Sequence, residues 1–230
     1  TATATVNVVN AGSPTASISA STNATCFGVC NGTATGSATG GVAPYTYSWS
    51  PAGGTTVNAT GLCAGTYTFT VTGSNGCSAT ATVTITQPTA VTASISGSTP
   101  VSCNGGSNGT ATVTAGGGTP GYSYNWTPSG GTGATGTGLA AGSYTVTVTD
   151  LNGCTAAATV TITQPTVVTA TISASTNILC NGGNNGSATA TAGGGTPGYS
   201  YSWTPTAQTS ATATGLTAGT YSVTATDKNG

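Results

Sequence analysis

The sequence predicts an all-β protein made of tandem immunoglobulin-like β-sandwich repeats that form an elongated rod. Trp49, Trp126 and Trp203 are each 77 residues apart (126 − 49 and 203 − 126), so one module is copied along the chain. Within each copy, short runs alternate apolar and small polar residues, as half-buried strands do, and no helical periodicity occurs. A period of this length suits a small independent domain better than a solenoid unit.

The middle copy shows the expected elements in order. Strands rich in β-branched residues alternate with Gly-rich stretches, whose glycines supply the positive φ angles of tight connections. About seven short strands per copy are typical of a compact sandwich. The clearest strand segments are Val91–Ile95, Thr110–Ala115, Tyr122–Thr127, Ser143–Asp150 and Ala156–Gln164.

The domain boundaries follow from Gln87-Pro88 and Gln164-Pro165, which keep the same spacing. Thr1–Val6 matches Ser78–Val83, so the chain is expected to start inside a repeat. The alternative is that residues 1 to 10 complete the third repeat of a neighbouring subunit. The expected divisions are 1–11 as the last strand of a preceding repeat, and immunoglobulin-like repeats at 12–88, 89–165 and 166–230, the third without its last strand.

Two local motifs fit a sandwich of this kind. Leu139 followed by Tyr144 resembles the corner before the penultimate strand, where a tyrosine hydroxyl bonds back to the backbone. Asp150–Gly153 then predicts a hairpin, in which Asp150 is a turn residue and not a ligand. The counterparts of the corner are Leu62 with Tyr67 and Leu216 with Tyr221.

One aromatic stripe has two interpretations. Tyr122, Tyr124 and Trp126 lie at alternate positions, and therefore on one face of a strand. We expect the tryptophan and at least one tyrosine to fill the core. In the alternative, one exposed tyrosine per repeat contributes to a carbohydrate-binding surface. The candidates for that role are Tyr45, Tyr122 and Tyr199.

The cysteines predict disulfides. Cys26 and Cys77 are 51 residues apart, as are Cys103 and Cys154, so each pair is expected to staple its own repeat. Asn229-Gly230 matches the residues before Cys77 and Cys154, so a cysteine is expected next.

Three further cysteines complete the set. Cys30 and Cys63 occur in the first repeat alone and are expected to pair with each other, whereas Cys180 should pair with the cysteine expected after residue 230. A metal site at Cys26-x-x-x-Cys30 is the weaker alternative because the chain has no histidine. Persistent disulfides predict an extracellular or cell-surface protein.

Composition argues against catalysis. The chain has one basic and two acidic side chains, Lys228, Asp150 and Asp227, and no histidine. General acid–base catalysis, nucleophile activation and metal binding all need such groups in clusters, so we expect no catalytic, cofactor or metal site. A net charge of −1 also argues against nucleic-acid binding, and no apolar run is long enough for direct membrane insertion.

The connection between repeats is short. Thr84–Thr92 passes from a last strand to a first strand through Pro88, with few spare residues. Proline fixes φ, so this link should be stiff. With strands rising about 3.3 Å per residue, each repeat should advance the rod by roughly 35 to 45 Å.

Four segments of the middle repeat carry a recognisable pattern: Cys103-Asn-Gly-Gly-Ser-Asn-Gly-Thr-Ala, Gly118-Thr-Pro-Gly-Tyr-Ser-Tyr-Asn-Trp126, Gly142-Ser-Tyr-Thr-Val-Thr-Val-Thr-Asp150 and Asn152-Gly-Cys154. Together they resemble the SprB-type repeat of cell-surface adhesins in gliding Bacteroidota. The resemblance covers essentially the whole chain. It implies type IX secretion, display on the cell surface, and adhesion to a substratum or to polysaccharide.

Three functions remain open from the sequence. The first is an extracellular structural or adhesive stalk, in which the repeats provide reach and stiffness. The second is carbohydrate binding by the repeats themselves. The third is self-association into filaments by strand complementation or lateral packing, which low net charge favours.

Overall fold

The computed structural model describes residues 1–7 and 12–230, which form two compact units. Unit 1 comprises Thr1–Thr92, Ala115–Tyr122 and Val148–Ala156, and unit 2 comprises Ala93–Thr114, Ser123–Thr147 and Ala157–Gly230. The division runs through the second repeat, one end of which belongs with the first repeat. All regular elements in the described part are strands, and no helix there could cross a membrane.

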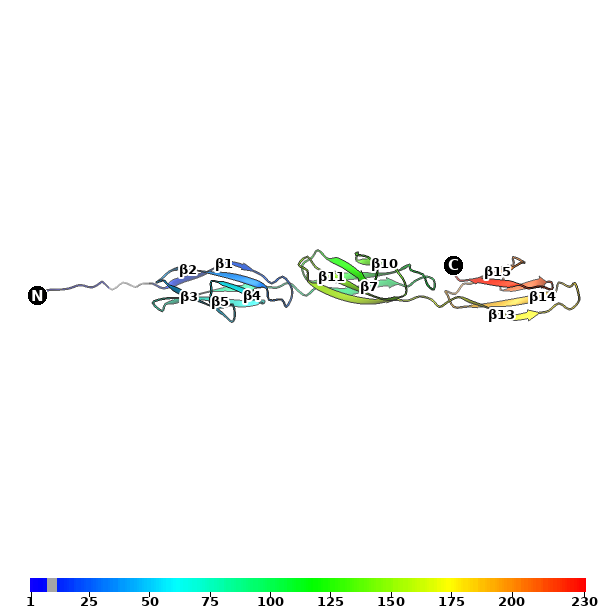
Figure 1. The fold of residues 1–230 in the computed structure, drawn as a ribbon, viewed down its shortest axis with the longest axis horizontal. Coiled ribbons are helices and arrows are strands. Elements are labelled where there is room, and N and C mark those ends of the chain that lie inside the picture. The colour runs from blue at the N-terminus through cyan, green and yellow to red at the C-terminus, as the bar shows by residue number, and fades with distance from the viewer. Residues whose placement is uncertain (8–11) are drawn as a thin grey trace. The chain divides into compact units, whose positions relative to one another are not determined.

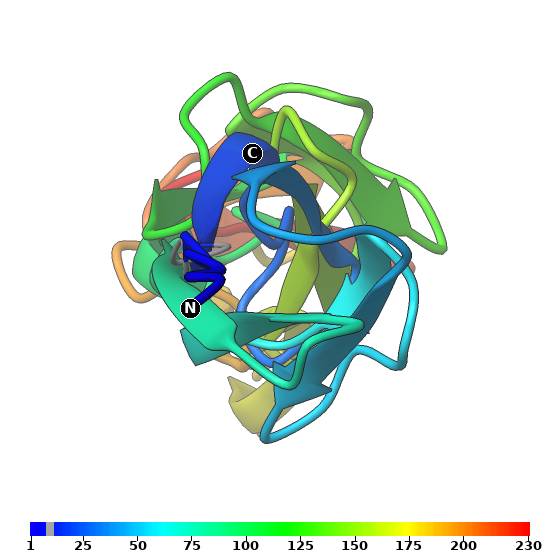
Figure 2. The same cartoon turned by 90° about the vertical axis from the view of Figure 1, so that its left-hand side faces the viewer.

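The first repeat is a sandwich of two antiparallel three-stranded sheets (Figures 1 and 2). The strand orders are β1-β2-β4 and β3-β5-β6. The strands are β1 (Pro14–Thr22), β2 (Gly32–Gly40), β3 (Tyr45–Ser50), β4 (Asn58–Leu62), β5 (Gly65–Gly73) and β6 (Ser78–Ile85).

The second repeat has the same plan, with strand orders β10-β8-β7 and β12-β11-β9. Its strands are β7 (Thr92–Thr99), β8 (Gly109–Gly116), β9 (Ser123–Thr127), β10 (Thr135–Leu139), β11 (Gly142–Thr149) and β12 (Thr155–Ile162).

The third repeat differs in one sheet. Its first sheet has the order β13-β14-β16, but β15 and β17 form a two-stranded sheet. The strands are β13 (Thr169–Thr176), β14 (Gly186–Gly193), β15 (Ser200–Thr204), β16 (Thr212–Leu216) and β17 (Ser222–Thr226).

Alternation along each strand places the apolar side chains in the core. In β5, Tyr67, Phe69 and Val71 are buried while the threonines between them are less so. Trp49 from β3 packs on Phe69 with ring centroids 4.8 Å apart, and Leu62 from the opposite sheet belongs to the same core cluster. Both sheets therefore contribute to one core, and the all-β, immunoglobulin-like fold class is confirmed.

The number of strands per repeat is six in the first two repeats, not the seven expected. Between β3 and β4 the chain turns over Trp49, whose backbone N–H donates to Gly54 O at 3.0 Å. Gly53 has a φ of +124°, and a Cβ there would lie 2.9 Å from the Trp49 Cβ. This glycine-rich segment covers the tryptophan and forms no strand. The short strands β4 and β10 escaped prediction because Asn58–Leu62 and its counterpart lack clear alternation.

The first residues form no strand. Residues 1–7 have no regular structure, and 8–11 lie outside the described residues. The assignment of 1–11 to a preceding repeat therefore stays a prediction. Every sheet in the described part uses strands from one repeat, and the boundaries near 88 and 165 stay predictions.

Candidate functional site

The disulfide Cys30–Cys63 is present as predicted. Cys30 lies just before β2 and Cys63 just after β4, and these strands pair with Gly32 opposite Leu62. The paired strand ends bring the two cysteines together. This bridge is internal to the first repeat, and the other repeats have no counterpart in the sequence.

The pairing predicted for Cys26 is wrong. Cys26 forms a disulfide with Cys154, 128 residues away, with a Cα–Cα distance of 5.8 Å. Cys77 and Cys103 are free, so the predicted bridges Cys26–Cys77 and Cys103–Cys154 do not occur. The bond lies within unit 1 and joins the first repeat to the end of the second repeat that packs there.

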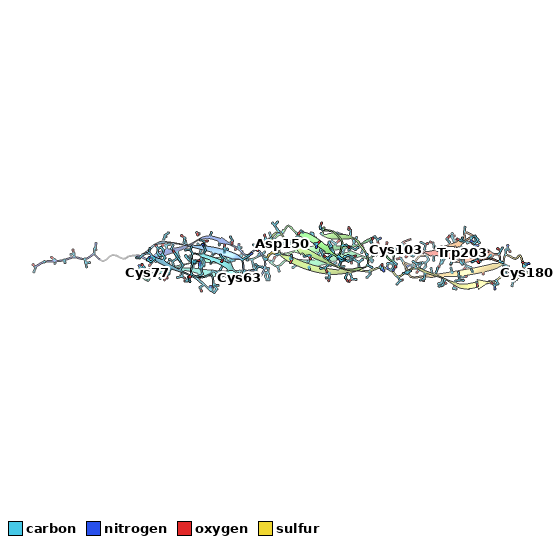
Figure 3. All side chains as sticks on the ribbon, viewed as in Figure 1. Cys63, Cys77, Cys103, Asp150, Cys180 and Trp203 are labelled. Carbon is cyan, nitrogen blue, oxygen red and sulfur yellow. A yellow bond between two sulfur atoms is a disulfide. The ribbon has the colours of Figure 1, made fainter. Side chains whose placement is uncertain are left out.

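The geometry of the sandwich explains the error. Cys26 lies near the end of β6, where Ala24 N–H donates to Thr86 O and Gly28 N–H donates to Gln87 Oε1. Cys77 precedes the start of β6. Eight residues of strand rising about 3.3 Å each separate these positions by roughly 26 Å, whereas bridged Cα atoms lie within about 7 Å. Figure 3 shows Cys77 and Cys63 at opposite ends of the first repeat.

The hairpin that carries Cys154 is shaped by Asp150. This buried carboxylate accepts backbone hydrogen bonds from Thr119 at 2.8 Å, from Asn152 at 2.9 Å and from Cys154 at 2.8 Å. The hydrogen bond from the Thr119 N–H is the largest cause that holds the pKa of Asp150 below its usual value; burial opposes it, and the N–H groups of Cys154, Asn152 and Gly153 lower the pKa further. The predicted turn role of Asp150 is confirmed.

Backbone and side-chain contacts accompany the disulfide. Asn152 Nδ2 donates to Thr25 O at 3.1 Å and to Thr119 Oγ1 at 2.8 Å, so the hairpin bonds to the backbone beside Cys26. The Cys154 sulfur lies 3.5 Å from Thr25 O. We call this arrangement the unit 1 junction: Thr25 and Cys26 on one side, and Asp150 to Cys154 on the other.

The linker after the first repeat packs tightly in unit 1. Gly118 N–H donates to Thr89 O at 2.9 Å. Gly117 has a φ of +66°, and a Cβ on it would lie 1.9 Å from Ala90 O. Only glycine fits here, because any side chain would collide with the linker backbone.

Unit 2 contains a matching arrangement one period later. Asn229 Nδ2 donates to Ser102 O at 2.8 Å and to Thr196 Oγ1 at 2.9 Å, as Asn152 does in unit 1. The Cys103 thiol lies 3.9 Å from Asn229 O. We call this the unit 2 junction. It places the hairpin end of the third repeat at Cys103.

The pairing expected for Cys180, with a cysteine after residue 230, stays a prediction. Cys180 is a free, exposed thiol in the loop after β13. Figure 3 shows Cys180 at one end of the third repeat. Asn229, near the C-terminal end of the repeat, lies with its backbone carbonyl against the Cys103 thiol.

The aromatic residues divide as expected for a core. Trp49, Trp126 and Trp203 are buried, and each indole N–H donates to a backbone carbonyl seven residues later. The tyrosine corner is present in each repeat: the hydroxyls of Tyr67, Tyr144 and Tyr221 donate at 3.1 Å to the backbone carbonyl four residues earlier.

The proposed surface tyrosines are half-buried. The hydroxyls of Tyr45, Tyr122 and Tyr199 donate to the carbonyls of Gly40, Gly117 and Gly194 respectively. Tyr45 also packs against the core of the first repeat. Carbohydrate binding by these residues stays a prediction.

Titratable and metal-binding side chains do not gather in the described part of the chain. No three of its His, Cys, Asp and Glu side chains lie close enough to hold one metal ion. The junctions are built instead from sulfur, amide and backbone groups, with the single carboxylate of Asp150 in the unit 1 junction.

The family comparison agrees with the period. The sequence model of the SprB repeat matches residues 18–55, 95–131 and 172–208, whose starts are 77 residues apart (95 − 18 and 172 − 95). The chain carries three SprB repeats. Each match begins inside the first strand of a repeat and runs past the third, and it includes Cys26, Cys103 or Cys180. No curated protein matches the sequence.

Solved structures give weaker likenesses. The three N-terminal domains of the bacteriophage RB49 highly immunogenic outer capsid protein Hoc align with 19% identity over 83% of this chain and 75% of that one, with a TM-score of 0.44. Sidekick-1 immunoglobulin domains 1–5 align with 13% identity over 89% and 50%, with a TM-score of 0.34. Domains 1–6 of the surface layer protein SbsC align with 14% identity over 95% and 39%, with a TM-score of 0.31. The fold assignment rests on the strands and sheets described above.

Proposed function

We propose that this SprB-repeat chain is a load-bearing stalk segment of a large repetitive bacterial surface protein, and that it performs no catalysis. The observation that carries the proposal is the Cys26–Cys154 disulfide, which joins two successive SprB repeats within unit 1. Disulfides also suit a protein that works outside the cytosol.

The disulfide changes the path of an applied force. When the two chain ends are pulled, tension passes from Cys26 directly to Cys154 through the sulfur bridge. The residues between them cannot extend while the bond is intact. The Cys30–Cys63 bond lies inside this protected segment and adds no further shielding. Most of the first two repeats is therefore shielded from complete extension.

Single-molecule pulling tests the stalk function. The bond prevents extension of the chain between two cysteines that are 128 residues apart, which at about 3.5 Å per residue amounts to roughly 45 nm of contour length. Pulling under oxidising and reducing conditions should show that difference. The matched control is Cys77→Ser, which changes a free thiol and should leave the oxidised contour length unchanged. A chain that extends to its full length under oxidising conditions would contradict the proposal.

The finer parts of the proposal extend the SprB resemblance. We propose that the stalk is exported by type IX secretion, displayed at the surface of a gliding bacterium and used for adhesion to a substratum or polysaccharide. A glycan array probed with the 230-residue chain tests whether the repeats themselves bind sugar. Binding that depends on Tyr45, Tyr122 and Tyr199 would support an adhesive role for the repeats. If no sugar binds, the mechanical role is the only one supported for the repeats.

A further inference from the structure

The third repeat has an open cavity of about 280 Å³ beside the β13-β14-β16 sheet, lined by polar and apolar groups in similar measure. Gly186, Leu216 and Tyr221 are among the residues that line it, with Asn177 and Ile178 on the loop side. All of these residues belong to unit 2.

The first two repeats show what occupies the equivalent position. In the first repeat, a Cβ on Gly32 would lie 2.6 Å from the Cγ2 of Ile85, at the end of β6. In the second, a Cβ on Gly109 would lie 2.7 Å from the Cγ2 of Ile162, at the end of β12. Both isoleucines are almost fully buried. Gly186 is the third member of this series, and it lines the cavity.

The neighbouring sheet edge agrees with the cavity. β12 lies beside β11, where Val146 and Val148 are completely buried. β17 is an edge strand, and the corresponding Val223 and Ala225 are half-buried. An edge strand with unpaired backbone groups next to a partly apolar cavity is the arrangement used in β-strand addition.

A polar anchor recurs beyond the isoleucine. Gly28 N–H donates to Gln87 Oε1 at 2.8 Å, and Gly105 N–H donates to Gln164 Oε1 at 2.8 Å. Gly182 holds the same left-handed backbone, with a φ of +77°, in the third repeat. A strand that places isoleucine in the cavity would carry its glutamine to this N–H.

We propose that unit 2 accepts a cysteine-led β-strand with the sequence pattern of residues 154–164. The strand adds antiparallel to β17, seats its isoleucine in the cavity and holds its glutamine at Gly182. Its cysteine then stands next to Cys103, as Cys154 stands next to Cys26 in unit 1. This inference does not depend on the stalk function, because it concerns strand addition and thiol placement without load.

The N-terminal segment of a second copy is the weaker occupant. When Thr1–Val6 is aligned with Ser78–Val83, Val8 corresponds to Ile85 and Asn10 corresponds to Gln87. Valine is smaller than isoleucine and buries less apolar surface, so the cavity contact favours the cysteine-led strand.

The test uses the 230-residue chain and a synthetic peptide with the sequence of residues 154–165. The peptide cysteine is activated as a mixed disulfide with thionitrobenzoate. The Cys103 thiolate attacks the peptide sulfur, a new S–S bond forms, and thionitrobenzoate leaves with the electrons of the broken bond. The thiol proton passes to water, and no oxidant is needed. Released thionitrobenzoate gives the rate, and mass spectrometry of peptide fragments gives the modified cysteine.

The three free thiols make the test selective. We expect the peptide to modify Cys103 at least about tenfold faster than Cys180, although Cys180 is the more exposed, because binding raises the local thiol concentration. A scrambled peptide should modify Cys180 first. A peptide with serine in place of the isoleucine should lose most of the Cys103 preference, since the buried apolar contact is removed.

Two outcomes would overturn the proposal. One is equal modification of Cys103 and Cys180 by the ordered and scrambled peptides. The other is tighter binding of a peptide with the sequence of residues 1–11, measured by the rise in the urea midpoint of Trp203 fluorescence, which would assign the groove to a second copy of the chain.

Discussion

Removal of the unit 1 disulfide by Cys26→Ser should destabilise the first repeat strongly. On the chain-entropy model, a closed loop of 128 residues contributes about 4.9 kcal/mol to the free energy of unfolding, when both repeats unfold together. The Cys26–Cys77 loop of 51 residues suggested by sequence spacing would give about 4.1 kcal/mol. These two stabilisation energies are too similar to tell the two pairings apart, so the experiment must identify the partner of Cys26 directly.

The partner is found with matched variants. We expect Cys154→Ser to lower the free energy of unfolding as much as Cys26→Ser does, and the double variant to be no worse than either alone. Cys77→Ser should change stability by less than about 0.5 kcal/mol, since that thiol is free. Urea denaturation, followed by fluorescence of variants that retain only Trp49 or only Trp126, reports each repeat separately.

One pattern of results would refute the assignment. If Cys77→Ser costs several kcal/mol and Cys154→Ser leaves the Trp49 transition unchanged, the bridge is internal to the first repeat. Non-reducing peptide mapping gives an independent check, because the fragment with Cys26 should be recovered bound to the fragment with Cys154.

Three further predictions concern the backbone and the hairpin. Gly117→Ala should lower the free energy of unfolding by at least about 2 kcal/mol in urea denaturation, because its φ is positive and Ala90 O is in the way; Gly131→Ala, with a positive φ and open space, should cost less. The pKa of Asp150 is lowered in the folded state, so the carboxylate stabilises the fold fully above a pH of about 3.8, the usual pKa of the group, and this stabilisation is lost as the pH falls through the folded-state pKa. The urea midpoint of Asp150→Asn should therefore vary less over that acid range than the midpoint of the unchanged chain. Equal acid sensitivity of the two proteins would contradict this. Tyr144→Phe removes the corner hydrogen bond and should cost about 1 kcal/mol by thermal denaturation, with an unchanged melting temperature as the contrary result.

Much of the fold could be predicted because it depends on local pattern. The spacing of Trp49, Trp126 and Trp203 fixed the repeat, and alternation around Tyr144 placed the core strand and the corner. The turn role of Asp150 also followed from residue type, since Asp, Asn and Gly in succession favour a tight hairpin. The short strand β10 was missed because Thr135–Leu139 is rich in glycine and owes its conformation to pairing with β8.

The sequence by itself determined the 77-residue period, the longer sandwich strands, the buried tryptophans and the pairing of Cys30 with Cys63. Only the tertiary structure decided the partner of Cys26. In a periodic chain, Cys77 and Cys154 are equivalent by spacing, since they differ by one period. Disulfide formation depends on distance in space, and an eight-residue strand separates the two ends of a sandwich by roughly 26 Å. The cysteine at the far end of the same repeat is out of reach, and the hairpin of the following repeat brings Cys154 to Cys26 instead.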